Sequence, residues 1–193
     1  MELEDPPMKN DSLPLQVEEV TLRRAGPGDQ ADLLDYFGHP DVAQFQFWEP
    51  WTRDQVDDFI SRQSQVRLGN PGVPLTLAVV LECEGRVIGS CQLTINGVED
   101  RQGEVGLAFN PAYCGRGFAT RAVKAALGFG FARLHLHRIV VAVDVRNEKS
   151  WRLMERVGMR REAHFRHDAL SKGEWIDDYI YAILETEWGA TGE

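Results

Sequence analysis

One stretch of the sequence, residues 103–132, combines a strand, a glycine-bearing turn and a helix in that order. An apolar run at 105–109 ends at Asn110-Pro111, and the segment CGRGFA follows at 114–119. From Phe118 to Phe129, apolar residues recur every three or four positions, which predicts a helix. Small residues let the backbone approach a phosphate, and the first N–H groups of a helix point at it. The stretch therefore predicts a site for a phosphorylated ligand.

This turn differs from two familiar nucleotide-binding loops. It lacks the lysine and hydroxyl pair that holds a nucleoside triphosphate with magnesium. It also lacks the three glycines of the dinucleotide fingerprint. We therefore expect a phosphorylated ligand other than ATP with magnesium or NAD.

The composition limits the classes of protein that the chain can belong to. Its 193 residues suit one domain, and an apolar content of 43% is enough for an ordinary core. The formal net charge of -9 argues against a surface for nucleic acid or anionic membrane. It favours cationic partners, although acidic soluble proteins are common.

Cysteine usage and the chain's opening residues bear on the compartment. Cys83, Cys91 and Cys114 are odd in number and have no C-x-x-C spacing, which indicates a reducing compartment. No stretch reaches the roughly 20 apolar residues that cross a bilayer. The opening MELEDPP has neither the basic nor the apolar region of a signal peptide. We therefore expect a cytoplasmic protein.

The remaining patterns predict an alternation of helices and strands within a single domain, 18–188. Residues 1–17, acidic and proline-bearing, and residues 189–193 are expected to be tails, the first of them flexible. Strands are expected at 20–24, 75–83, 86–95, 138–143, 159–165 and 175–184. Beyond the helix that follows the turn, others are expected after Asp29, from the Thr52-x-x-Gln55 capping box to about Leu68, and from Ser150 to a stop at Gly158. The near-continuous apolar run at 138–143 is typical of a strand covered on both faces.

Three motifs in this order resemble the GNAT superfamily of acyl-CoA-dependent N-acyltransferases. The family's phosphate loop, Q/R-x-x-G-x-G/A, stands here at 114–119. A second family motif, N-x-x-S-x-x-x-x-E-K-x-G-F, stands as Asn147, Ser150, Glu155, Arg156, Gly158 and Met159. The ending from Lys172 to Trp188 gives a third likeness. The chain is most similar to the branch that holds the Rim-type N-terminal acetyltransferases of ribosomal proteins.

The resemblance implies a mixed α/β (α+β) GNAT fold, with a twisted central sheet of about seven strands and about four helices. The central strand and the strand after the central helix would splay apart, and the pantetheine arm of acetyl-CoA would enter the gap. The residues implied in binding this co-substrate are Leu107, Ala108, Phe109, Cys114, Gly115, Arg116, Gly117, Phe118, Ala119, Thr120, Asn147 and Ser150. Cys114 replaces the usual Gln or Arg, which a cradle of backbone N–H groups tolerates.

The resemblance also implies direct transfer of an acetyl group from acetyl-CoA to a primary amine. Glu104 opens the central strand, where relatives often carry a glutamate that acts as a base through water; the alternative is a solvent-facing carboxylate at a strand edge. Many relatives carry a tyrosine at the position of Met154 to protonate the departing thiolate. Methionine cannot donate a proton, so Ser150 or water is expected to serve instead.

The acceptor site is expected at Trp48, Asp177 and Asp178. Because side chains alternate along a strand, one of the two aspartates must point inward and the other outward. An aromatic run like the one around Trp48 is more often core or lid packing than a substrate site. A protein N-terminus is the expected acceptor. The alternatives are a small-molecule amine, such as an antibiotic, a polyamine or an amino-acid-like compound, and a non-catalytic acyl-CoA sensor.

The histidines are the remaining candidates for chemistry. His135-x-His137 and His164-x-x-His167 lack nearby cysteines and helical i, i+4 placement, so we expect polar or surface histidines and no metal. The implied partners are acetyl-CoA and an amine, without nucleic acid or membrane. The chain is expected to be a monomer or a homodimer.

Overall fold

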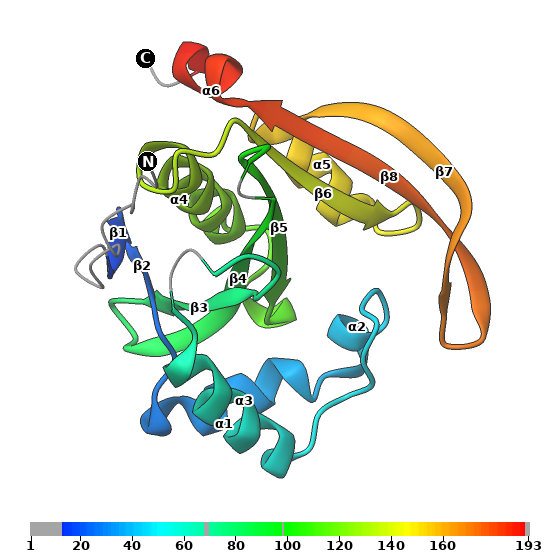
Figure 1. Cartoon of the computed structure of the whole chain (residues 1–193). Coiled ribbons are helices and arrows are strands. Elements are labelled where there is room, and N and C mark those ends of the chain that lie inside the picture. The colour runs from blue at the N-terminus through cyan, green and yellow to red at the C-terminus, as the bar shows by residue number, and fades with distance from the viewer. Residues whose placement is uncertain (1–12, 68–69, 98, 192–193) are drawn as a thin grey trace.

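The protein is described here by a computed structural model that covers residues 13–67, 70–97 and 99–191 (Figure 1). Eight strands form one sheet in the order β1-β2-β3-β4-β5-β6-β8-β7. They are β1 (Leu15–Val17), β2 (Val20–Arg23), β3 (Leu75–Leu81), β4 (Arg86–Gly97), β5 (Gln102–Phe109), β6 (Arg138–Asp144), β7 (Arg160–Ser171) and β8 (Glu174–Leu184). Neighbouring strands are antiparallel except β5 and β6, which are parallel. The expected mixed sheet is confirmed, with eight strands where about seven were predicted.

Six α-helices and two short 3-10 turns accompany the sheet in the described residues. The helices are α1 (Gln30–Phe37), α2 (Pro40–Ala43), α3 (Arg53–Gln65), α4 (Phe118–Ala132), α5 (Glu148–Arg156) and α6 (Glu185–Thr191). The 3-10 turns are η2 (Pro27–Asp29) and η3 (Pro111–Tyr113). None of these helices is long and apolar enough to cross a membrane.

Two elements fall where the sequence predicts tails. Residues 1–12 lie outside the described part of the chain, but Leu15–Val17 form β1 and pair with β2. At the other end, α6 extends to Thr191, and Trp188 packs its ring 6.2 Å from that of Phe131 on α4. Sequence patterns alone missed both elements because three residues of strand and seven of helix are too short to show a period.

Two clusters of buried side chains lie on opposite faces of the sheet. The larger one joins α4 and α5 to the sheet, with Val123, Leu127 and Met154 fully buried. The smaller one joins α1 and α3 to the other face, where Ala78 and Ala108 belong to the sheet. In Figure 1, α1 and α3 lie together at the lower edge, away from α4 and α5.

Local sequence signals set the ends of several helices. Thr52 and Gln55 form the predicted capping box: the Gln55 side chain accepts from the Thr52 N–H at 2.8 Å, and Thr52 Oγ1 accepts from the Gln55 N–H at 3.5 Å. Gly158 follows α5 with φ of 93°, a left-handed conformation that glycine adopts without strain. These two helices begin and end close to the predicted positions.

One prediction for β6 is wrong. Its apolar run, 138–143, suggested a strand covered on both faces, but within that run only Ile139, Val141 and Val143, which share one face, are buried. Val140 is half-buried and Ala142 is exposed on the opposite face.

The β7–β8 hairpin forms one edge of the sheet and curves away from the other strands, so that its tip lies on the side of α2 (Figure 1). There, Lys172 Nζ donates to the carbonyl oxygen of Ala43 at 2.8 Å and lies 3.6 Å from Glu49. The hairpin tip is therefore held beside α2 and the connection that follows it.

Candidate active site

The parallel strands β5 and β6 separate part-way along their length. They are paired at Gln102–Arg138, Gly103–Ile139 and Glu104–Val140, and the pairing ends there. Residues 105–109 of β5 therefore present backbone N–H and C=O groups along an edge that β6 does not fill. At this edge Gln46 donates to the Leu107 carbonyl oxygen at 3.3 Å. A ligand with amide groups could bind to such an edge as an additional strand would.

The glycine turn lies between the end of β5 and the start of α4. Gly115 and Gly117 have φ of 79° and 86°, and Gly117 is the N-cap of α4. The left-handed φ of Gly117 makes the position one that glycine adopts without strain; a Cβ there would also meet the flexible end of Arg121 at 2.7 Å. The N–H groups of Phe118, Ala119 and Thr120 have no acceptor within the helix. This geometry fits a pyrophosphate at the helix N-terminus.

Basic side chains gather near this turn. Arg116 stacks over the ring of Phe118 at 4.8 Å, and Arg156 of α5 lies 3.5 Å from the Thr120 hydroxyl. Arg121 is paired with Glu18, so its charge is already partly offset. The local charge is thus positive in a chain that is acidic as a whole, which suits an anionic ligand.

Asn147 and Ser150 lie at the start of α5. Asn147 is the N-cap, and its Oδ1 accepts from the Ser150 N–H at 3.2 Å. Asn147 therefore caps the start of α5 through its side-chain oxygen. Its side-chain amide N–H is left to donate to a ligand. Ser150 is half-buried. Met154, one turn further, is fully buried in the core, and its thioether has no proton to donate.

Glu104 marks the point where the strands part. Its side chain is exposed and lies 3.4 Å from the side-chain amide of Asn96. Alternate side chains along a strand share a face, so Glu104 points to the same side as Ala108, four residues further along β5, which is the side of α1 and α3. The carboxylate is thus accessible to water beside the gap, as a base acting through water would need to be.

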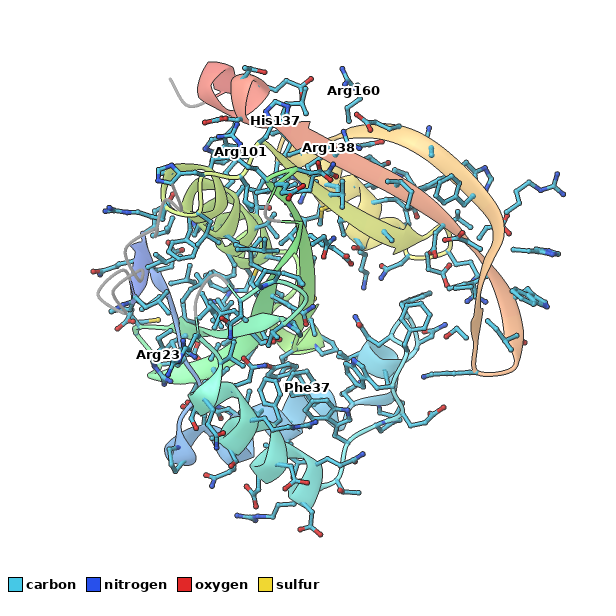
Figure 2. All side chains as sticks on the ribbon, viewed as in Figure 1. Arg23, Phe37, Arg101, His137, Arg138 and Arg160 are labelled. Atoms are coloured by element: carbon cyan, nitrogen blue, oxygen red, sulfur yellow. The ribbon has the colours of Figure 1, made fainter. Side chains whose placement is uncertain are left out.

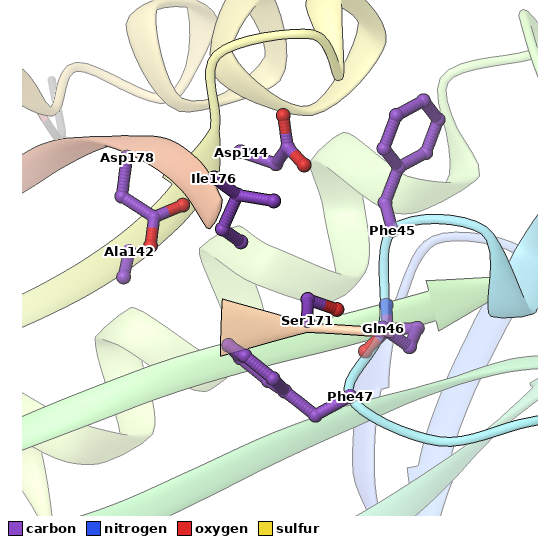
Figure 3. Close-up of a pocket in the computed structure, with 8 residues that line it drawn as sticks. All are labelled: Phe45, Gln46, Phe47, Ala142, Asp144, Ser171, Ile176 and Asp178. Atoms are coloured by element: carbon purple, nitrogen blue, oxygen red, sulfur yellow. The ribbon is translucent and has the colours of Figure 1, made fainter. Parts of the chain in front are cut away.

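A cavity of about 50 Å³ opens on this same face (Figure 3). Three residues of the α2–α3 connection, Phe45, Gln46 and Phe47, line one side of it. The sheet contributes the other side, with Ala142, Asp144, Ser171, Ile176 and Asp178. Because Asp144 pairs with Asp178 across β6 and β8, the two carboxylates come from adjacent positions of neighbouring strands.

The two predicted acceptor aspartates point in opposite directions, as the alternation of a strand requires. Asp178 is 5% exposed and lines the cavity. Asp177 faces β7, where it accepts from the His167 N–H at 2.9 Å and lies 3.2 Å from His164 Nε2. The structure therefore brings only Asp178 to the cavity.

The surroundings of these carboxyl groups shift their pKa values in opposite directions. The hydrogen bond from the His167 N–H lowers the pKa of Asp177 below its ordinary value. Burial raises the pKa of Asp178, and the nearby charge of Asp144 raises it further. Asp178 thus carries a charge that its surroundings stabilise poorly.

Trp48 lies in an aromatic cluster with α1 and α3. Its ring is 5.4 Å from that of Phe37, which Figure 2 labels, and 5.6 Å from that of Trp51. Phe59 of α3 joins the same cluster. Its neighbours Phe45 and Phe47, not Trp48 itself, line the cavity.

The cysteines and histidines show no grouping that would indicate other chemistry. Cys114 is exposed, with its Sγ 3.8 Å from the Asn110 carbonyl oxygen, and Cys91 is buried. Burial raises the pKa of the Cys91 thiol to about 12, so it stays protonated. Within the described residues, no three His, Cys, Asp or Glu side chains gather as a metal site would require.

Sequence patterns did not single out several residues at this site. Asp144 stands in an Asp-Val-Arg-Asn stretch that resembles a loop, and Phe45 and Phe47 belong to a run in which only Trp48 was selected. Gly106 leaves the same face of β5 without a side chain beside the gap; a Cβ there would meet only Gln92, at 3.8 Å. A glycine inside a strand often marks a close approach by a ligand, so the position of Gly106 between Glu104 and Ala108 was the signal that could have found it.

Comparison with known proteins agrees with this fold. Residues 19–160 match the family described as the acetyltransferase (GNAT) domain. The match covers well over half of the chain, which therefore belongs to the GNAT family of acetyltransferases.

Two sequence relatives are N-acetyltransferases. The chain is 31% identical to spermidine N(1)-acetyltransferase of Escherichia coli (strain K12) over 153 residues, which is 76% of each protein. It is 45% identical to the uncharacterized N-acetyltransferase YnaD of Bacillus subtilis (strain 168) over 85 residues. That second match spans 44% of this chain and only 50% of the relative.

Two solved structures share the fold. A GNAT-family acetyltransferase from Bacillus anthracis superposes with a TM-score of 0.80 and is 29% identical, covering 90% of this chain and 99% of that one. Spermidine N-acetyltransferase from Vibrio cholerae, solved with CoA and spermine, has a TM-score of 0.76 at 24% identity, with 89% and 99% covered.

Proposed function

We propose that this GNAT protein transfers the acetyl group of acetyl-CoA to a primary amine at the gap between β5 and β6. The observation that carries the proposal is the end of strand pairing at Glu104 and Val140, with the glycine turn following β5 at the far end of the unpaired stretch. A gap that opens toward a helix N-terminus suits a ligand with an amide-bearing arm and a pyrophosphate. The CoA bound in the Vibrio cholerae relative supports this co-substrate.

Acetyl-CoA would be held by three parts of the chain. The backbone N–H groups from Gly115 to Thr120 would bind the pyrophosphate. The free edge of β5 at Leu107, Ala108 and Phe109 would pair with the pantetheine amides, with Gln46 giving up its contact to Leu107. Asn147 would donate its amide N–H to the arm from the side of α5.

The transfer itself requires an uncharged amine. An alkylammonium has a pKa near 10, so it must lose a proton before it can attack. Glu104 would take that proton through water, and the nitrogen lone pair would then form a bond to the thioester carbon. An N–H near Phe109 would stabilise the oxyanion. The carbon–sulfur bond breaks, and the CoA thiolate takes a proton from Ser150 or from water.

A small alkyl amine is the acceptor that the cavity favours. Its volume of about 50 Å³ leaves room for an amine head group, and its wall carries the Asp178 carboxylate. The spermidine acetyltransferases among the relatives support the same class. The likeness of the chain to the Rim-type branch supports a protein N-terminus as the second candidate.

The test is thiol release from acetyl-CoA with a panel of amines. The panel contains alkyl amines, amino acids and peptides with a free N-terminus, and each product is identified by mass spectrometry. We expect thiol release to match acetylated alkyl amine in amount. Peptide acetylation alone would favour the second candidate. Binding of acetyl-CoA without thiol release for any amine would indicate a sensor, and no binding would refute the assignment.

A further inference from the structure

Asp178 is a buried carboxylate without a hydrogen-bond partner among the described residues. It is 5% exposed, and its side chain lines the cavity between the sheet and the α2–α3 connection (Figure 3). An unpaired buried charge is costly, so a folded chain normally pairs it. A cation that enters the cavity from outside would supply the missing partner.

The basic side chains nearby are already engaged. Arg146 donates to both oxygens of Asp144, at 2.6 Å from Nη2 and 3.0 and 3.1 Å from Nε, and its N–H donates at 2.9 Å. Lys172 is held by Ala43 and Glu49 at the hairpin tip. Asp144 is thus neutralised within the chain, whereas Asp178 is not.

The rest of the cavity wall suits an alkylammonium group. The rings of Phe45 and Phe47 come from one side, and Ala142 and Ile176 from the other. An aromatic ring attracts a cation to its face, and aliphatic side chains accommodate methylene groups. The carboxylate and the rings together suit an ammonium group, and the aliphatic side chains suit the alkyl chain that carries it.

The position of Asp178 separates this cation from the reacting amine. The last pair of β5 and β6 is Glu104–Val140. Ala142 lies two residues beyond it along β6, as Gly106 does along β5. Asp178 belongs to β8, one strand further from the gap, and neighbouring strands lie about 4.8 Å apart. A nitrogen bound at Asp178 is consequently displaced sideways from a nitrogen that attacks a thioester in the gap.

We infer that the cavity at Asp178 binds a second, non-reacting ammonium group of the acceptor, so that the preferred substrate is an alkyl diamine. This inference rests on the proposed function and adds the class of acceptor to it. The first nitrogen reacts near Glu104, and the alkyl chain crosses the face of β6 over Ala142. Phe45 and Phe47 cover the second nitrogen from the α2–α3 connection.

The experiment compares linear diamines with monoamines of equal chain length at saturating acetyl-CoA. For the wild-type chain we expect a kcat/KM at least tenfold higher for the best diamine than for its monoamine. In Asp178→Asn, the KM of the diamine should rise at least tenfold while the monoamine changes less than about twofold. Asp100→Asn removes a charge from the exposed β4–β5 turn and should leave both substrates unaffected.

A second variant guards against a folding defect in Asp178→Asn. Phe47 is 72% exposed, so Phe47→Leu should fold and still raise the KM of the diamine several-fold. Peptides whose second residue is lysine or norleucine form a further arm, because a lysine side chain could supply the second ammonium. A preference for the lysine peptide over every diamine would overturn the small-molecule assignment.

Equal losses for diamine and monoamine in Asp178→Asn would show that the cavity does not distinguish the second charge, and the inference would be wrong. The proposed function would survive that result, because monoamine acetylation would still be measured. If the wild-type chain acetylated no amine at all, the proposed function itself would fail.

Discussion

Glu104 on β5 lies opposite Val140 on β6, and this is the last pair at which the two parallel strands meet. Beyond it, five residues of β5 and four of β6 continue without each other. The exposed carboxylate therefore stands at the closed end of the gap, while the glycine turn follows β5 at the open end. The proposed path of acetyl-CoA therefore runs from the glycine turn at the open end toward Glu104 at the closed end.

Gly117→Glu should abolish the pyrophosphate site. The left-handed φ of 86° disfavours any side chain, and glutamate would add a negative charge at the helix N-terminus. We expect CoA affinity in calorimetry to fall at least tenfold. Gly85→Glu is the matched control, because Gly85 has φ of 62° in the β3–β4 turn with open space around it. Wild-type affinity in Gly117→Glu would contradict the assignment.

Asn147→Asp separates the two roles of this residue. Aspartate is as good an N-cap as asparagine, so the unfolding free energy should stay within about 0.5 kcal/mol of wild type. The variant loses the side-chain N–H and adds a charge beside the proposed pantetheine arm, so kcat/KM should fall about tenfold. Asn147→Ala should also lose about 1 kcal/mol of stability. An unchanged kcat/KM in both variants would leave Asn147 with a structural role only.

Glu104→Gln keeps the shape of the side chain and removes its basicity. We expect kcat to fall on the order of a hundredfold, with acetyl-CoA affinity nearly intact. The rate should recover partly at high pH, where solvent deprotonates the amine. Steady-state kinetics between about pH 6 and 9 provide the measurement. Full kcat across that range would place the base elsewhere or make a base unnecessary.

Asp178→Asn should make the ligand-free chain more stable at neutral pH. The pKa of Asp178 is raised in the folded state, so the folded chain binds its proton more tightly than the unfolded chain does. Stability is therefore lost as pH rises from the unfolded pKa, near 4, through the folded pKa. The variant avoids this loss, which should be on the order of 1 kcal/mol.

Thermal unfolding at several pH values tests this prediction. The difference between variant and wild type should shrink as the pH falls below about 4, where the carboxyl group is protonated in both states. A variant that is less stable than wild type at neutral pH would mean that Asp178 has a partner within the chain.

The elements that form the site could largely be predicted from the sequence. Thr52 and Gln55 signal a helix start locally, and the glycines at 115 and 117 signal a turn that only they can form. Such signals involve neighbours along the chain, so one sequence contains them. The motifs carrying the GNAT resemblance added the mixed sheet and the place of the gap.

The acceptor side could not be predicted in the same way. The pairing of Asp144 with Asp178 depends on the register of β6 against β8. The two residues are more than thirty positions apart in the chain. The approach of Phe45 and Phe47 depends on the hairpin tip, where Lys172 contacts Ala43. Neither relationship leaves a periodic pattern, so Trp48 was selected over its cavity-lining neighbours.

The central claim is that transfer takes place in the gap beside Gly106, and Gly106→Val tests it most directly. A Cβ there meets only Gln92, at 3.8 Å, so the fold should tolerate the change. The valine would occupy the bare face of β5 where the acceptor must approach the thioester. The measurement is acetylated amine formed per unit time, alongside CoA affinity. We predict at least a tenfold loss of product with CoA affinity within about twofold of wild type; full turnover in Gly106→Val would contradict the account.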